Sequence, residues 1–157
     1  PVLLEQLELW LAPYLNGVTR PEQLKRIDLK GALLARLSWP VLQTFNDLFP
    51  VAIKVPTGSN IKICYRECEP PVLSVRMQEI FGQQETPCIF AGRIKLQLAL
   101  LSPARRPLQL TQDLATFWQG AYHDVKKEMR GRYPKHYWPD NPLEAQATTR
   151  TKKYIKK

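Results

Sequence analysis

The sequence predicts an α+β fold in which N-terminal helices lead into a small antiparallel sheet, followed by a long amphipathic helix and a basic tail. Three observations support this fold class. Apolar residues recur at helical spacing through residues 1–50, apolar and polar residues alternate through much of 51–101, and one apolar stripe runs along 111–131. We therefore expect one folded domain over residues 1–145 and a flexible tail over 146–157.

The N-terminal helices are predicted from their apolar positions and from their caps. Residues 2–14 carry leucines and aromatic residues at helical spacing. Thr19 and Glu22 have the spacing of a capping box for the next helix, and Asp28 can cap the helix after that. Pro40 suits the first turn of a fourth short helix, so the first 50 residues are expected to be mostly helical.

The hydrophobic period changes to two after residue 50. Residues 51–65 alternate on either side of turn-forming residues at 56–60, which predicts a β-hairpin, and 93–101 alternates as a third strand. Between them, Leu73–Phe81 returns to helical spacing. With three strands indicated, an OB-like barrel over residues 50–101 is one alternative for this part of the chain.

The C-terminal helix over residues 111–131 is the longest predicted element. Thr111 can cap its N-terminus, and Asp113 lies where the positive end of the helix dipole favours a carboxylate. Gly131 can end the helix, with Pro134 shortly after it.

Positive charge is concentrated in the last part of the chain. Residues 1–92 hold nine lysines and arginines and nine carboxylates, whereas residues 93–157 hold fourteen and five, which accounts for the whole net charge of +9. This asymmetry favours a polyanionic partner, either nucleic acid or an anionic membrane surface. The sequence contains no run of about eighteen apolar residues, so it predicts no membrane span.

The cations of the long helix share one face. His123, Lys126, Lys127 and Arg130 follow the spacing i, i+3, i+4 and i+7, opposite the apolar stripe. We expect this face to bind the phosphates of a nucleic acid. The alternative is a solvated face whose cations stabilise the negative end of the helix dipole.

The loop after the helix interleaves cations with rings. Cations neutralise phosphates and aromatic faces stack on unpaired bases, so this mixture is typical of a surface that binds single-stranded nucleic acid. The alternative is that loop aromatics, Tyr133 and Trp138 above all, fold back onto the core. The candidate binding residues of the loop are Arg132, Tyr133, Lys135, His136, Tyr137 and Trp138.

Two further basic segments are candidates for phosphate contacts. Arg105 and Arg106 lie in a turn before Pro107, where a backbone phosphate could approach, although an exposed hairpin tip is an equally good interpretation. The tail adds unspecific attraction or solubility through its own cations, Arg150, Lys152, Lys153, Lys156 and Lys157.

Metal and catalytic sites are not predicted. Cys64, Cys68 and Cys88 are odd in number and irregularly spaced, which indicates reduced thiols and a cytoplasmic protein rather than a disulfide framework. With the two histidines they form no CxxC or HxxxH pair, so we expect no metal site. GxSxG, HExxH and P-loop motifs are absent, and we expect no catalysis, ATP hydrolysis included, from this chain alone.

The segment at residues 100–145 resembles the C-terminal signature of the bacterial HrpB-type DEAH-box ATP-dependent helicases. It reads LLSPARRPLQLTQDLATFWQGAYHDVKKEMRGRYPKHYWPDNPLEA. Two upstream segments are similar to the same region of that family: DLKGALLARLSWPVLQTFNDLFP at 28–50 and PPVLSVRMQEIFG at 70–82. The resemblance therefore covers most of the chain from residue 28 to residue 145.

The resemblance implies that the chain is a C-terminal accessory domain that follows a helicase core of two RecA-like domains. The start at Pro1, rather than at a methionine, also indicates a piece of a longer protein. In the family the core holds the P-loop and the DEAH carboxylates, and with them ATP and Mg²⁺. Neither motif occurs here, so no cofactor is expected in this chain. Residues 130–139 and Arg105-Arg106 match the family's pattern, which assigns them no role.

Three functions remain open at this point. The domain could bind RNA or single-stranded DNA through the basic and aromatic surface. It could instead dock a protein partner or the helicase core, with the loop aromatics and arginines as the binding hot spot. It could also be purely structural, with its cations paired to acidic groups of the helicase core of the same chain.

Overall fold

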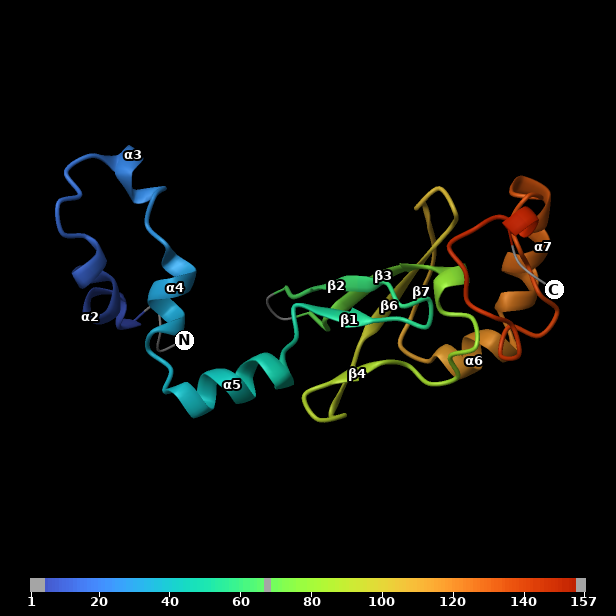
Figure 1. Cartoon of the computed structure of the whole chain (residues 1–157), viewed down its shortest axis with the longest axis horizontal. Helices are drawn as coiled ribbons and strands as arrows, with labels where there is room; N and C mark the ends of the chain where they lie inside the picture. The colour runs from blue at the N-terminus through green and yellow to red at the C-terminus, as the bar shows by residue number, and fades with distance from the viewer. Residues whose placement is uncertain (1–4, 67–68, 155–157) are drawn as a thin grey trace. The chain divides into compact units, whose positions relative to one another are not determined.

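The structure is a computed structural model that describes residues 5–66 and 69–154 (Figure 1). It divides the chain into two compact units, residues 1–47 and 48–157, and each is described by itself. None of the helices among the described residues is long and apolar enough to cross a membrane.

The first unit is made of short helices. They are α2 (Leu7–Leu11), the 3-10 helix η1 (Ala12–Tyr14), α3 (Pro21–Leu24), α4 (Leu29–Leu34) and most of α5 (Trp39–Leu48). Among the hydrophobic side chains described in this unit, Trp10 and Ala32 are buried. Because so few side chains are enclosed, this unit has little hydrophobic core of its own.

The caps of this unit are partly as predicted. Asp28 caps α4, since its Oδ1 accepts a hydrogen bond from the Gly31 backbone N–H at 2.9 Å. The cap of α3 differs from the Thr19–Glu22 prediction. Gln23 Oε1, one residue further on, accepts the backbone N–H groups of Thr19 at 2.8 Å and Arg20 at 2.9 Å. The amide of Gln23 therefore satisfies the donors that we assigned to a glutamate.

The second unit contains a five-stranded sheet in the order β1-β2-β3-β6-β7 and a two-stranded sheet of β4 and β5. Its strands are β1 (Ala52–Lys54), β2 (Asn60–Cys64), β3 (Val72–Arg76), β4 (Cys88–Ile89), β5 (Ile94–Lys95), β6 (Gln97–Leu101) and β7 (Pro107–Thr111). The other elements are η2 (Met77–Glu79), α6 (Leu114–Gln119), α7 (Tyr122–Arg132) and η3 (Lys152–Tyr154).

The sheet is mixed rather than antiparallel, because β3 and β6 pair in parallel while the other described pairs are antiparallel. The α+β class is confirmed, but the helix predicted over Leu73–Phe81 is wrong. Leu73 and Val75 form the buried face of β3, and only a 3-10 turn follows them. The order leaves β1 and β7 at the ends of the sheet, and the OB-like closure is not among the pairings of the described strands.

The hydrophobic core lies on the inner face of the sheet and under α6 and α7. Leu98 and Leu100 of β6 are fully buried, and β3 flanks them with Leu73 and Val75. The helices cover this face with Leu114, Phe117, Trp118, Tyr122 and Met129, all of them buried. Burial of this apolar surface is the main force that holds the second unit together.

Residues 111–131, which we predicted to be one long helix, contain the last residue of β7 followed by two helices, α6 and α7. Thr111 ends β7, and Asp113 caps α6 by accepting the Thr116 backbone N–H at 3.0 Å, a bond that lowers the pKa of Asp113. Gly120 separates α6 from α7. The apolar stripe is continuous across this break, because both helices face the same core.

The C-terminal residues contact the second unit at several points. Ala145 is buried, the Thr148 backbone N–H donates to Gln78 O at 2.9 Å, and the Lys152 N–H donates to Lys135 O at 2.9 Å. Thr148 and Lys152, in the stretch that we predicted to be a flexible tail, are therefore hydrogen-bonded to η2 and to the loop after α7. Lys156 and Lys157 lie outside the described residues.

Candidate nucleic-acid interface

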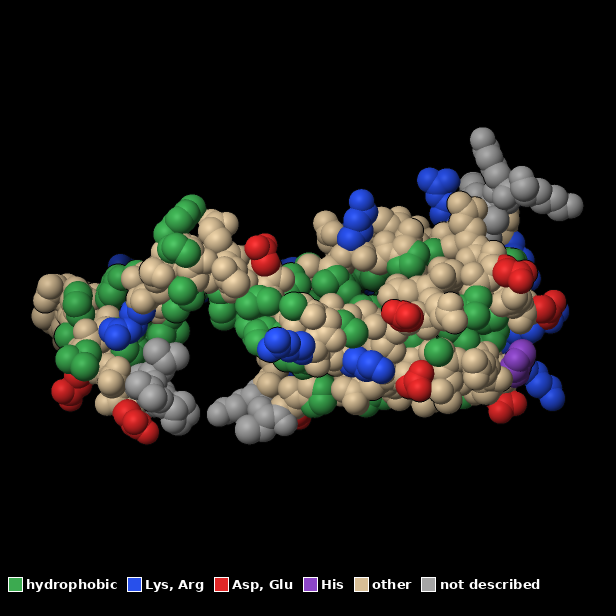
Figure 2. All heavy atoms as spheres, turned by 90° about the horizontal axis from the view of Figure 1, so that it is seen from below, with side chains coloured by type: hydrophobic (Ala, Val, Ile, Leu, Met, Phe, Trp, Pro, Cys, Tyr) green, Lys and Arg blue, Asp and Glu red, His purple; other side chains and the backbone are tan. Residues whose placement is uncertain are grey.

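Helix α7 carries three exposed cationic or titratable side chains of the predicted face, His123, Lys127 and Arg130. Figure 2 shows lysine, arginine, histidine and carboxylate side chains gathered at the end of the second unit that carries α7. Lys127 and Arg130 form no ion pair within residues 5–66 and 69–154. Their charges are therefore available to an external anion.

Lys126, the fourth member of that face, has a partner. Its Nζ lies 2.6 Å from Asp140 Oδ1, and its side chain is only 13% exposed. The hydrogen bond and the charge of Lys126 lower the pKa of Asp140, with smaller contributions from Arg130 and His123. Asp140 thus places a carboxylate beside the cationic face of α7. The spacing of the residues along the chain does not predict this contact.

Arg132, at the end of α7, faces a carboxylate on its own helix. Its Nη2 lies 3.5 Å from Glu128 Oε1, and both side chains are well exposed. Exposed pairs of this kind are weak, so Arg132 can exchange Glu128 for a phosphate. Arg130 and Arg132 also lie in the last turn of α7, where a cation stabilises the helix dipole.

The rings of the loop after α7 are largely turned inward. Trp138 is 5% exposed, and its indole N–H donates to Tyr133 O at 3.1 Å. Tyr133 and Tyr137 are half-buried against the core, with Tyr137 edge-on to Phe81 at 6.4 Å between ring centroids. For Trp138 this corrects the expectation of a free stacking face. The ring follows the alternative prediction and packs on the core.

The loop is held in place from inside the unit. The Tyr122 hydroxyl of α7, which is buried, donates to Pro139 O at 2.8 Å. Burial raises the pKa of Tyr122, so this hydroxyl keeps its proton and its donor role. His136 is half-buried, and its pKa is lowered first by burial and then by the charge of Arg76. Lys135, the residue directly before His136, is exposed.

Arg105 and Arg106 lie in the hairpin turn between β6 and β7, and both are exposed. The Arg106 backbone N–H donates to Ser102 Oγ at 3.0 Å, and the Ser102 N–H donates to Arg106 O at 2.8 Å. Arg105 has φ +59°, a left-handed conformation that is uncommon for a side chain other than glycine. The predicted turn is confirmed, although it leads into β7 and not into a helix.

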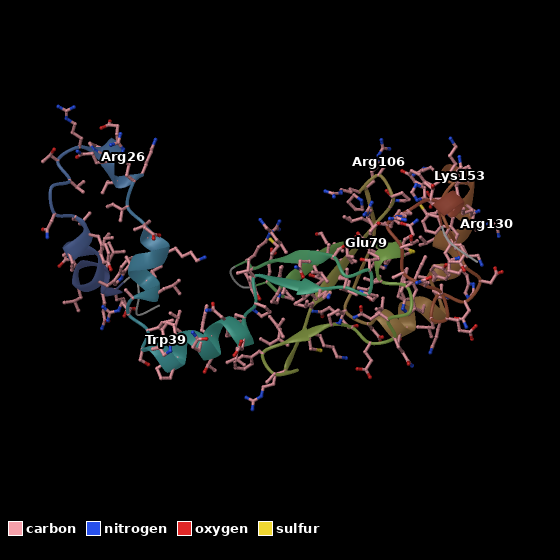
Figure 3. All side chains as sticks on the ribbon, in the orientation of Figure 1. Arg26, Trp39, Glu79, Arg106, Arg130 and Lys153 are labelled. Atoms are coloured by element: carbon pink, nitrogen blue, oxygen red, sulfur yellow. The ribbon has the colours of Figure 1, made fainter. Side chains whose placement is uncertain are left out.

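Figure 3 shows the positions of three of these basic residues. Arg106 projects from the β6–β7 hairpin, while Arg130 and Lys153 lie where the C-terminal segment meets α7. The cations of the second unit therefore come from separate elements, and Arg105-Arg106 is not continuous with the α7 face along the backbone.

A pocket of about 280 Å³ adjoins the cationic face of α7. His123 and Asp140 line it together with Gln119, Asn141 and Leu143, and the buried Trp118 is part of its wall. Asn141 and Leu143 were not among the predicted site residues. They are brought there by the loop after α7, which is a tertiary arrangement with no signature in the sequence.

The described residues contain no group of three or more His, Cys, Asp or Glu side chains that could hold a metal ion. Cys64 and Cys88 are free and exposed. Cys68, which we considered with them, lies outside the described residues.

Comparison with known proteins identifies relatives for nearly the whole chain. A family model described as "ATP-dependent helicase C-terminal" (HrpB_C) matches residues 10–142. The protein "ATP-dependent RNA helicase HrpB" of Escherichia coli (strain K12) is 53% identical over 152 residues, which is 97% of this chain and 19% of that protein. The chain thus spans about a fifth of the length of this curated relative.

Two solved structures are similar in fold. The crystal structure of E. coli DExH-box NTPase HrpB matches with a TM-score of 0.86 and 52% identity, over 95% of this chain and 18% of that one. The crystal structure of Escherichia coli DEAH/RHA helicase HrpB matches with a TM-score of 0.67 and 50% identity, over 87% and 17%.

Proposed function

Because the chain belongs to the family of HrpB-type ATP-dependent helicase C-terminal regions, we propose that it is an accessory domain that holds single-stranded nucleic acid for a helicase core of the same protein. The relative's name, ATP-dependent RNA helicase, supports RNA as the nucleic acid, with single-stranded DNA as the other candidate. ATP and Mg²⁺ are bound in that core, outside this chain, and the chain contributes binding rather than catalysis. The free thiols of Cys64 and Cys88 support a reducing, cytoplasmic setting.

The observation that carries this proposal is the exposed pair Lys127 and Arg130 on α7, which forms no ion pair within the described residues. Phosphates that displace counterions at this face supply the binding free energy. Arg132 and Lys135 add further exposed cations, and His123 adds an exposed imidazole, on the same helix and the loop after it. The Arg105-Arg106 turn supplies a separate point of contact.

Base stacking has a smaller part than the sequence suggested. Trp138 is buried, while Tyr133 and Tyr137 are half-buried and packed against the core. A ring in that position offers an edge, or part of one face, to a base. We therefore propose that phosphate contacts contribute more than stacking and that binding has little sequence preference.

The test is fluorescence anisotropy of labelled oligouridine and oligothymidine with the 157-residue chain, over a series of salt concentrations. We expect binding at low salt that weakens as salt rises. The Lys127→Ala/Arg130→Ala variant should bind more weakly. Its slope of log affinity against log salt should be shallower by about 0.7 for each phosphate of a single strand that is no longer neutralised.

The matched control is Lys25→Ala/Lys30→Ala, which removes two exposed cations from the first unit. It changes the net charge equally and should leave the affinity close to that of the unaltered chain. Absence of binding at low salt, or equal loss in both variants, would contradict the proposal.

A second candidate function, docking onto the helicase core, is favoured by the exposed apolar side chains of residues 5–48. Trp39 and Leu9 are each 70% exposed and Val41 is 50% exposed. Side chains of this size in a unit with so little buried surface favour a protein-binding role. The occupant could also be a separate protein partner.

This candidate is tested by mixing the chain with a separately produced helicase core of the same protein and measuring co-elution in the presence of nuclease. Docking through this unit predicts co-elution that Trp39→Ser/Val41→Ser abolishes, with oligouridine affinity unchanged. Elution of the two as separate species would reject it.

A further inference from the structure

The second unit contains another pocket, of about 300 Å³, that the cationic face of α7 does not line. It lies on the five-stranded sheet, where β2 and β3 meet the end of β6 and the β6–β7 turn. The polar and charged side chains that line it are Asn60, Lys62, Ser74, Arg76, Glu79 and Arg105. Among them, only Arg105 was a candidate from the sequence.

Strand alternation places the members of this set that lie in β2 and β3 on one face: Asn60, Lys62, Ser74 and Arg76. In the β2–β3 pair Ile63 lies opposite Leu73 and Cys64 opposite Val72. Continued in the same register, Lys62 falls opposite Ser74, next to Leu73 on the chain but on the other side of the sheet. The buried residues therefore face the core, while the polar residues between them line the pocket.

Arg76 is the fixed member of the pocket. Its Nε donates to Glu79 Oε2 at 3.0 Å, and the Glu79 side chain is only 7% exposed. A buried carboxylate that holds Nε orients the planar guanidinium, and this bond does not use the end-on edge, which carries one N–H from each of the two terminal amino groups. The guanidinium is thus oriented before any ligand arrives.

The charge balance of the pocket favours an anion. Three cations, Lys62, Arg76 and Arg105, line it with one carboxylate, and that carboxylate is already paired to Arg76. Arg105 is exposed at the rim and can move towards a ligand. The hydroxyl of Ser74 and the amide of Asn60 add neutral hydrogen-bond donors, which suit an oxyanion.

The shape of the turn supports the same interpretation. Arg105 has φ +59°, and the backbone and hydroxyl of Ser102 hold the turn through their bonds to Arg106. A left-handed non-glycine residue costs free energy, and such residues concentrate at binding sites. Here the turn that contains this residue brings Arg105 to the same pocket as Arg76.

We propose that this pocket is a phosphate-binding site, in which the guanidinium of Arg76 makes a two-pronged contact and Lys62 and Arg105 close over the phosphate oxygens. The phosphate site is inferred from the residues that line the pocket and from the Arg76–Glu79 pair. Only the assignment of the phosphate to a nucleic-acid strand rests on the proposed function. A free phosphate or pyrophosphate has the same chemistry and is separated from a strand by the experiment.

The experiment follows backbone and arginine side-chain NMR signals of the 157-residue chain during titration with inorganic pyrophosphate, and anisotropy with labelled oligouridine in parallel. We expect pyrophosphate to shift signals of Lys62, Arg76 and Arg105. The Lys62→Gln/Arg105→Gln variant should lose these shifts and bind oligouridine on the order of tenfold more weakly, as expected when charge-assisted hydrogen bonds are removed.

Two further variants separate geometry from charge. Arg76→Lys keeps the charge but loses the planar fork, so it should weaken pyrophosphate binding while thermal unfolding shows that the fold is kept. Lys54→Gln removes an exposed cation from neighbouring β1, outside the pocket, and should change neither readout.

Each result decides one question. Oligouridine binding that is equal in Lys62→Gln/Arg105→Gln and Lys54→Gln, with no pyrophosphate shifts in the pocket, overturns the inference and leaves the α7 interface intact. Pyrophosphate shifts without any oligouridine binding keep the phosphate site and reject the nucleic-acid strand as its source. Pyrophosphate shifts that persist in Lys62→Gln/Arg105→Gln and in Arg76→Lys would also overturn the proposed phosphate site.

Discussion

Tyr122 connects helix α7 to the loop that follows it through one buried hydroxyl. The ring is fully buried beside Trp118 and Phe81, and its hydroxyl donates to Pro139 O at 2.8 Å. Burial keeps the pKa of this hydroxyl above its usual value, so it remains a donor. One side chain therefore fixes both the core and the start of the Asp140 segment.

Removal of this hydroxyl should destabilise the fold. Tyr122→Phe leaves the buried Pro139 carbonyl without its donor, which costs about 1–3 kcal/mol in the free energy of unfolding. Urea denaturation measures the change. Tyr65→Phe is the matched control, because the Tyr65 hydroxyl donates to Pro50 O at the same distance of 2.8 Å but at an exposed position. Equal losses in the two variants would contradict this explanation.

His136 makes stability depend on pH. Burial and the neighbouring Arg76 lower its pKa in the folded state below the ordinary value of 6.5. As the pH falls below 6.5, the unfolded chain binds a proton that the folded chain does not. The contribution of His136 is therefore fully present above pH 6.5 and is lost as the pH falls through the folded pKa.

Denaturation of the unaltered chain and of His136→Gln at a series of pH values checks this expectation. The free energy of unfolding should fall more steeply on acidification in the unaltered chain than in the variant. Parallel curves would show that His136 has no part in the dependence.

At the scale of single elements, periodicity was informative where an element has one buried face. The alternation of residues 51–65 predicted the β1–β2 hairpin, and the apolar stripe predicted the core-facing side of α6 and α7. Periodicity failed at β3, because Leu73, Met77 and Ile80 are buried for different reasons, one in a strand and two in or beside the following 3-10 turn. Strand β7 was not predicted: none of its five residues is buried, so it lacks the alternation that marks a strand with one buried face.

The cationic face of α7 also shows what residue spacing can predict and what it cannot. Spacing placed four side chains on one face, and three of them are exposed. The fourth, Lys126, pairs with Asp140, which comes from a loop beyond the end of the helix. A one-dimensional pattern cannot anticipate a carboxylate that reaches the helix through tertiary structure.

This arrangement predicts that Asp140→Asn strengthens nucleic-acid binding. The substitution removes a negative charge and frees Lys126 for a phosphate, so the affinity for oligouridine should rise, by a few-fold at low salt and less at high salt. The Asp140 side chain is 96% exposed, so the fold should be kept. Anisotropy measures the effect.

Asp124→Asn is the control for net charge. It removes an exposed carboxylate from α7, the helix that carries Lys126, without releasing Lys126 from Asp140. A gain in Asp124→Asn as large as in Asp140→Asn would show that net charge, not release of Lys126, controls binding.

At the scale of the whole molecule, the core belongs to one of the two units. The buried cluster runs from Val55 to Ala145 and draws on both sheets, α6, α7 and the C-terminal segment. The described part of the first unit encloses only Trp10 and Ala32 among its hydrophobic side chains. The single domain that we expected over residues 1–145 is thus divided at residues 47 and 48, near the predicted change from helices to strands.

The fragment 48–157 should therefore fold by itself. We expect a cooperative thermal transition by circular dichroism, close to that of the whole chain, because its core is kept. The fragment 1–47 should show no such transition, because a segment of this length with so little buried surface is not stable alone. A loss of cooperative unfolding in 48–157 would show that the first unit is needed for its stability.

The sequence by itself determined the fold class, the excess of positive charge in the C-terminal part, the amphipathic face of α7 and the family. These properties are local in the chain: they follow from composition, from periods of two or 3.6 residues, and from a continuous matching segment. Tertiary structure alone decided the parallel β3–β6 pair, the inward packing of Trp138, the Lys126–Asp140 pair and the pocket around Arg76. Each of these depends on which distant segments of the second unit lie next to one another in space. A ring or a charge is exposed only where no other segment covers it, and that competition for burial cannot be read along one dimension.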